Sequence, residues 1–300
     1  MTDRIVEVAE TAATLTLSLD RLRAAAEGIV LFECPLREIA AVVVSHPRSY
    51  VSTALLSALA ANGIALIVSD TKRMPTGWLM GIETHATQSE RFRAQAKASL
   101  PLRKRLWQAL VCSKIRGQAE VLRTVTGDDG GIAGLEPLVR SGDPDNVEAR
   151  ASRILWSRLF ADRDPEFRRD RQRPGFNAGL NYGYAILRSL TARAIAGAGL
   201  HPTLGVHHHS RYDAYCLADD LMEPFRPLVD WKVASLDEPA GDLSREYRQA
   251  LAALVSSPVT IGTERRTLTD ALSVSARTLA RAFVDGVPKL RLPRQLLHGA

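Results

Sequence analysis

The period of the hydrophobic pattern changes once along the 300 residues of this chain, and that change limits the folds it can adopt. Before about residue 83, short apolar runs rich in β-branched residues alternate with turn-forming residues, which is typical of strands. From about residue 96 onward, apolar residues recur every three or four positions, which is typical of helices. The sequence therefore predicts an α+β protein: a small β-rich amino-terminal domain (1–82), a linker (83–95) and a larger all-α domain (96–300).

The first part carries the clearest strand and helix signals. Residues 15–19 alternate strictly between leucine and small polar residues, as in a half-buried strand. Residues 39–44 and 64–68 are short apolar runs, which indicate buried strands. Between them, residues 52–61 predict a helix that ends at residues 62–63, because asparagine and glycine both accept a left-handed backbone.

The second part is expected to consist of amphipathic helices joined by glycine-rich turns. A turn at residues 142–145 leads into one helix, with Asp145 or Asn146 as the expected N-cap. Further helices are predicted over residues 177–196, 213–225 and 267–284.

The positive charge of the chain is concentrated in one segment. The formal net charge is +6, and residues 150–193 contain ten arginines, four acidic residues and no lysine. A guanidinium fork suits phosphate oxygens, although a solvated helical surface would have the same composition. The charge therefore indicates a possible polyanionic partner without identifying it.

Cysteine usage and hydropathy exclude several classes of protein. The three cysteines are odd in number and widely spaced, which argues against a disulfide framework and against a C-x-x-C metal site. No apolar run approaches the ~18 residues that suggest a membrane span, and the amino terminus lacks a secretory pattern. We therefore expect a cytoplasmic protein with no membrane partner.

Carboxylates and histidines in three separate segments are candidates for chemistry. Glu148 lies in a first helical turn, where complementarity to the helix dipole is by itself the simpler explanation of this carboxylate. Neighbouring side chains of the triplet at residues 207–209 diverge, so at most one or two can bind a common ion. Asp220 and Glu223 are three residues apart on one expected helix face, where two carboxylates repel each other without a cation. Carboxylates with one imidazole suit Mg²⁺ or Mn²⁺ better than zinc.

Four sequence blocks carry a specific resemblance. They are N-V-E-A at 146–149, N-A-G-L-N-Y-G-Y-A-I-L at 177–187, G-L-H-P-T-L-G-V-H-H at 199–208 and L-A-D-D-L-M-E-P-F-R-P at 217–227. In this order, and together with the β-rich first third, they resemble the CRISPR-associated integrase family, in particular its type II branch. The resemblance covers nearly the whole chain.

The resemblance implies a metal-dependent DNA endonuclease and integrase of antiviral defence. Such an enzyme inserts spacer DNA into a CRISPR array by transesterification, in which a 3′-hydroxyl attacks a phosphodiester of the repeat. The family pattern places the ligands of Mg²⁺ or Mn²⁺ on Glu148, His208 and Glu223. Asp220 matches an additional acidic position, and His207 is a weaker candidate than His208.

The resemblance also implies partners. They are double-stranded and branched DNA, a second copy of the chain bound through the β domain, and a small companion protein of the adaptation complex. Candidates for phosphate contact are the arginines nearest the expected site, Arg150, Arg153, Arg168, Arg169, Arg171 and Arg173. The alternatives are a metal-dependent DNA-repair nuclease that cuts branched DNA without integration and a non-catalytic DNA-binding scaffold. A third, a hydrolase acting on a small molecule, is disfavoured by the concentration of arginine and by the four blocks.

Overall fold

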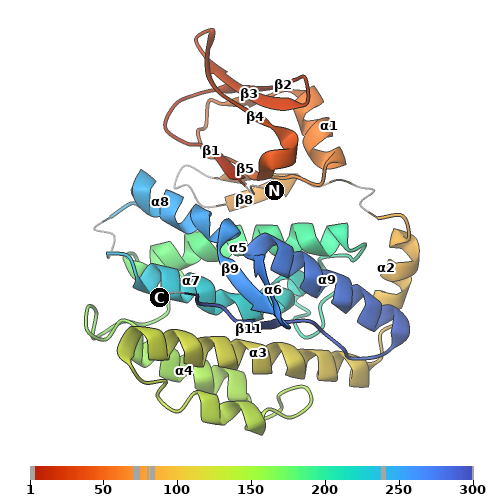
Figure 1. Cartoon of the computed structure of the whole chain (residues 1–300), viewed down its shortest axis with the longest axis vertical. Helices are drawn as coiled ribbons and strands as arrows, with labels where there is room; N and C mark the ends of the chain where they lie inside the picture. Colours follow the sequence, from red (N-terminus) through yellow and green to blue (C-terminus); the bar gives the residue numbers. More distant parts are fainter. Residues whose placement is uncertain (1–3, 70–74, 80, 82–84, 238–240, 299–300) are drawn as a thin grey trace.

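The chain folds into a small β-rich part and a larger helical part, as the sequence predicts (Figure 1). The computed structural model describes residues 4–69, 75–79, 81, 85–237 and 241–298. The expected domain boundaries at 82 and 95 stay a prediction, and residues 82–84 of the expected linker lie outside the described residues.

The first sheet joins the two parts. Its strands are β1 (Arg4–Val8), β5 (Ile39–Val44), β7 (Ala65–Ser69) and β8 (Pro75–Leu79), in the order β1-β5-β7-β8. The first three strands are parallel, and every residue of β5 is buried. Ala41 and Val43 pack into the helical core, whereas Val42 and Val44 pack into the small amino-terminal core. Burial on both faces explains why this strand is a continuous apolar run rather than an alternating one.

A second sheet lies on the outer side of the first. It contains β2 (Thr14–Ser18), β3 (Arg21–Ala26), β4 (Ile29–Pro35) and β6 (Tyr50–Val51), in the order β4-β3-β2-β6. Helix α1 (Thr53–Ala61) begins at Ser52, whose hydroxyl accepts a hydrogen bond from Leu55 N. The chain then turns at Gly63, which has a φ of +63°. Strand β4 is an edge strand, and its apolar residues from Ile29 to Phe32 are exposed.

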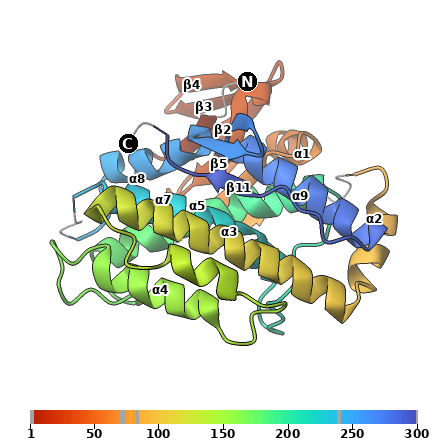
Figure 2. The ribbon, with the colours of Figure 1, turned by 60° about the horizontal axis from the view of Figure 1, so that its bottom comes forward.

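Two long helices organise the second part. Helix α5 (Phe176–Gly197) lies under the first sheet, and α3 (Leu100–Thr126) lies beside α4 (Val147–Arg158) (Figures 1 and 2). The remaining helices are α2 (Gln88–Ala96), α6 (Cys216–Met222), α7 (Arg226–Ala234), α8 (Arg245–Ala252) and α9 (Leu268–Asp285). Short 3-10 segments are η1 (Leu36–Glu38), η2 (Ala133–Leu138), η3 (Glu223–Phe225) and η4 (Ala253–Ser256). No helix within the described ranges is long and apolar enough to cross a membrane.

The helical part also contains a small sheet that the all-α expectation lacks. Strands β9 (Pro258–Ile261), β10 (Glu264–Thr267) and β11 (Pro293–Gln295) pair antiparallel in the order β10-β9-β11. Strands of three or four residues are too short for an alternating pattern to stand out. The segment after β11 is held on α3, because Leu296 N and Leu297 N donate to the Glu120 carboxylate over 2.9 Å.

Two glycines let other helices approach α5 closely. A Cβ atom at Gly183 would lie 2.5 Å from Cγ1 of Val229 in α7, and one at Gly179 would lie 2.5 Å from the hydroxyl of Tyr247 near the start of α8. Helix α7 follows η3 directly, so this close packing fixes the position of Glu223.

We expect Gly183→Ala to lower the free energy of unfolding by about 1–2 kcal/mol, because overpacking at Val229 outweighs the gain in helix propensity. Gly197→Ala is the matched control, because no atom lies within 4 Å of a Cβ placed at this exposed position of the same helix. Urea denaturation measures both. Equal free energies of unfolding for the two variants would mean that α7 can move away from α5 without loss of stability.

Candidate active site

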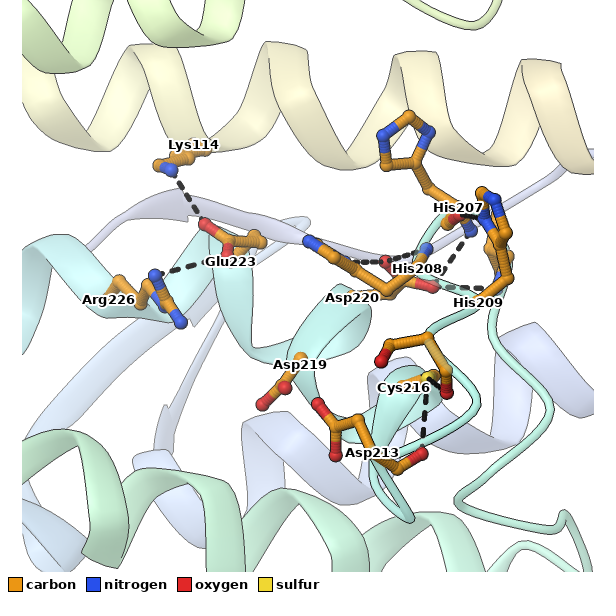
Figure 3. A network of polar contacts seen from close by, with 12 residues as sticks. Lys114, His207, His208, His209, Asp213, Cys216, Asp219, Asp220, Glu223 and Arg226 are labelled. Carbon is orange, nitrogen blue, oxygen red and sulfur yellow. Dashed lines mark hydrogen bonds and ion pairs between the residues drawn. The ribbon is translucent and has the colours of Figure 1, made fainter.

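Three segments that are distant in the sequence meet beside α3. Glu148 lies in the first turn of α4. Glu223 is the first residue of η3, and His208 lies in the loop before α6 (Figure 3). The structure therefore brings the three expected ligand residues to one region of the helical part.

A lysine joins the two glutamates. Lys114 of α3 forms ion pairs with Glu148 Oε1 and, over 2.6 Å, with Glu223 Oε2. The side chains of Lys114 and Glu223 are only 7% and 6% exposed, and that of Glu148 is 24% exposed. Both carboxylates thus reach a single nitrogen in a largely water-free position.

The charged state of this group follows from its partners. Burial disfavours the ionised form of Glu223, but Arg226 and Lys114 outweigh it and hold the pKa of Glu223 below its usual value. Burial also disfavours the charged form of Lys114, and Glu223 and Glu148 outweigh it, so the pKa of Lys114 is raised. Arg226 contacts the second oxygen of Glu223 over 3.3 Å. We therefore infer that Glu223, Lys114 and Arg226 are all charged near neutral pH.

Glu148 is oriented from two sides. Its Oε1 accepts a hydrogen bond from Ser152 Oγ at 3.0 Å, and its backbone N–H donates to Asp143 Oδ2 over 3.0 Å. Asp143 also accepts from Val147 N at 2.9 Å. The expected N-cap at Asn146 is confirmed, but its side chain forms no capping hydrogen bond, and the carboxylate of Asp143 accepts from the first backbone N–H groups instead.

Asp220 organises the histidine loop. Its fully buried carboxylate accepts hydrogen bonds from the backbone N–H groups of Val206, His207 and His208 at 2.6, 2.9 and 3.2 Å. Its Oδ1 lies 2.6 Å from His208 Nδ1. Gly205 permits the tight loop, since a Cβ atom there would lie 2.1 Å from the carbonyl oxygen of His208.

The expectation that Asp220 and Glu223 act on one helix face is not met. Asp220 faces the loop, whereas Glu223 faces Lys114 and Arg226 (Figure 3). The helical turn changes between them: α6 ends at Met222, and η3 begins at Glu223 with Pro224 in its first turn.

Of the three histidines, the geometry favours His208 as a ligand. The contact to Asp220 engages Nδ1 and leaves Nε2 as the remaining ring nitrogen, an arrangement common among metal-binding histidines. The His207 ring stacks on Trp107 of α3, with ring centres 4.2 Å apart and planes 5° from parallel. His209 Nδ1 lies 2.7 Å from the carbonyl oxygen of His207.

The donor types, two carboxylates and one imidazole, are of the kind that Mg²⁺ or Mn²⁺ accepts. Two carboxylates already share one cationic partner, and charges on His208 and Glu223 interact. Among the residues that the structure describes, no three His, Cys, Asp or Glu side chains converge as a ready-made metal site. The ammonium of Lys114 lies between the two carboxylates.

The six candidate arginines divide into two kinds. Arg169 is bound within the protein, because it donates to Asn177 Oδ1 over 2.9 Å and to Asn181 Oδ1 over 2.7 Å and lies over the Tyr184 ring. The other five are exposed: Arg150, Arg153, Arg168, Arg171 and Arg173. These five have the accessibility that phosphate contact requires.

Lys114, Ser152 and Arg226 are members of the site that were not predicted from the sequence. A signal for Lys114 was present, since it is the one charged residue in the run L-V-C-S-K-I at positions 110–115. Apolar neighbours on both sides indicate a buried lysine, which needs anionic partners.

Comparisons with known proteins agree on one family. The family described as CRISPR associated protein Cas1 matches residues 6–238 of this chain. The CRISPR-associated endonuclease Cas1 of Neisseria meningitidis serogroup C (strain 8013) is 39% identical over 208 residues, which span 68% of this chain and 66% of that protein, just under two thirds of its length.

Solved structures with the same fold are more distant in sequence. A casposase bound to integration product has a TM-score of 0.80 at 17% identity, covering 98% of this chain and 94% of that one. A Cas6-RT-Cas1–Cas2 complex has a TM-score of 0.75 at 18% identity, covering 99% of this chain and 36% of the matched chain. At these identities the likeness concerns the fold alone.

We expect the pKa of His208 to lie above 6.5, because the hydrogen bond with Asp220 outweighs burial, and we expect Asp220→Asn to lower it. A raised imidazole pKa stabilises the fold fully below pH 6.5, and this contribution is lost as pH rises through the folded value. NMR titration of the imidazole isolates the effect from Asp219, whose pKa burial raises to about 6. An unchanged His208 pKa in the variant would contradict the role of Asp220.

Proposed function

The chain belongs to the family of CRISPR-associated Cas1 proteins, and on that premise we propose that it is a DNA endonuclease and integrase of CRISPR adaptation. Its role is to insert new spacer DNA into a CRISPR array in the cytoplasm, as part of antiviral defence. One observation supports this most directly: Glu148 and Glu223, far apart in the sequence, meet at one cation beside His208.

Glu148, His208 and Glu223 are the proposed metal ligands. When bound, Mg²⁺ or Mn²⁺ supplies Lewis-acid chemistry at the phosphate and lowers the pKa of the attacking hydroxyl. The remaining residues position this set. Ser152 and Asp143 orient Glu148, Asp220 fixes the loop and the ring of His208, and Arg226 holds the second oxygen of Glu223.

The proposed reaction exchanges one phosphodiester bond for another. The 3′-hydroxyl of the incoming DNA forms a new bond to phosphorus, and the bond from that phosphorus to the 3′-oxygen of the repeat breaks. The proton leaves the attacking hydroxyl, and a hydroxyl forms on the departing strand. Water in place of the hydroxyl gives hydrolysis at the same site, so nuclease activity is expected as well.

Strand β4 is the proposed surface for a second copy of the chain. It is an edge strand whose apolar residues are exposed, with Ile29 at 67% and Leu31 at 53%. An exposed apolar edge strand is a ready partner for another strand, and isolated proteins usually protect such edges. The Cas1–Cas2 composition of the matched complex supports a small companion protein as a further partner.

We expect Glu148→Gln, His208→Ala and Glu223→Gln each to reduce joining and cutting by at least about a hundredfold, because each removes a proposed ligand. Glu166→Gln, at an exposed acidic position, is the control. The assay incubates the protein and its companion with prespacer DNA and a plasmid that carries repeats. Cutting without joined product would favour a repair nuclease, and full activity in all three variants would favour a scaffold.

We expect alanine at Arg168, Arg171 or Arg173 to weaken DNA binding uniformly across sequences. Each variant should reduce the slope of log affinity against log salt by about one, because one phosphate contact is lost. Arg245→Ala, an exposed change on α8, is the control. Fluorescence anisotropy at several salt concentrations measures the slopes, and slopes equal to the wild type would exclude these arginines from the DNA interface.

We expect Leu31→Glu to convert a dimer into a monomer, because it places a charge in the proposed apolar contact of β4. Leu19→Glu, at the exposed turn between β2 and β3, should leave the dimer intact. Sedimentation velocity reads out the mass directly. A wild-type monomer at micromolar concentration would contradict dimerisation.

A further inference from the structure

Lys114 is a buried charge whose neighbours on the helix are apolar. Leu110, Val111 and Ile115 are fully buried, and only the tip of the lysine reaches charged groups, namely Glu148 and Glu223. A lysine is almost never buried to this extent unless it is paired, and here both partners are carboxylates. Without Lys114 the two carboxylates would repel each other in a position that water scarcely reaches.

Lys114 occupies one oxygen of each proposed metal-binding glutamate. It pairs with Glu148 Oε1 and Glu223 Oε2. The other oxygen of Glu223 is engaged by Arg226, and Ser152 shares Glu148 Oε1. A cation that enters between the glutamates therefore meets an ammonium on the same oxygens.

We propose that Lys114 is an internal counter-ion that competes with the divalent metal for Glu148 and Glu223, so that metal binding exchanges one cation for another. This inference rests on the proposed function, because it takes these glutamates as metal ligands. Two properties follow. The metal-free protein keeps its carboxylates neutralised and stays folded, and its affinity for the metal is lower than the same carboxylates would give alone.

Metal binding to the stripped protein tests the exchange. Electron paramagnetic resonance of free Mn²⁺ gives the affinity without any need for activity. Lys114→Met removes the charge at similar length and should bind Mn²⁺ about tenfold more tightly or better. Lys114→Arg keeps the charge and should bind no more tightly than the wild type. Lys104→Met, on an exposed lysine about 15 Å along the same helix, should match the wild type.

Thermal unfolding provides a second, independent test of the cation exchange. In a chelator, Lys114→Met should unfold at a lower temperature than the wild type, because its glutamates lack a counter-ion. Saturating Mn²⁺ should raise the unfolding temperature of this variant more than that of the wild type. Should Lys114→Met fail to fold, Lys114→Gln, which lacks the charge but keeps a hydrogen-bond donor, carries both comparisons.

The outcomes separate this inference from the proposed function. Tighter Mn²⁺ binding by the uncharged variants, abolished by adding Glu148→Gln, supports both. Equal or weaker binding by the uncharged variants overturns the exchange, while loss of binding in Glu148→Gln would still uphold the metal site. If neither the wild type nor any Lys114 variant binds Mn²⁺, the metal site and the exchange both fail.

Discussion

The cost of burying carboxylates is the constraint on which the rest of this site depends. A glutamate as enclosed as Glu223 is stable in its charged form only beside cationic partners, and the fold provides two, Lys114 and Arg226. The same requirement explains Asp220, which is fully buried and is compensated by three backbone N–H groups and an imidazole. The two carboxylates are thus stabilised differently, Glu223 by cationic side chains and Asp220 by backbone N–H groups and the imidazole of a loop.

Packing contacts away from the charged residues set the positions of these residues. Gly179 and Gly183 of α5 allow α8 and α7 to pack closely against this helix, and η3 is directly joined to α7. Strand β5 is buried on both faces and so ties the amino-terminal sheets to the helical core. The positions of the charged groups are therefore set by apolar and glycine contacts that bear no charge.

Much of the fold and of the candidate site could be predicted from the sequence, wherever the hydrophobic pattern is long or the residue type is distinctive. Strand β5 and helix α5 follow from continuous apolar runs and helical spacing, and the order β-rich then helical follows from the change in period. The three short strands β9, β10 and β11 were not predicted, because each has too few residues to show an alternating pattern. That Asp220 and Glu223 face different partners also escaped prediction, because the chain changes from an α-helical to a 3-10 turn at Glu223.

Helix α3 touches nearly every component of the site. Trp107 stacks on His207, Lys114 holds both glutamates, Gln118 donates to Ser152, and Glu120 accepts from the segment after β11. One long helix thus contacts the histidine loop, the start of α4 and the segment after β11, and it sets their positions relative to one another. In a protein built in this way, the outer loops and the charged surface can change, and with them the choice of target. The spacing of the groups that carry out the reaction then stays the same.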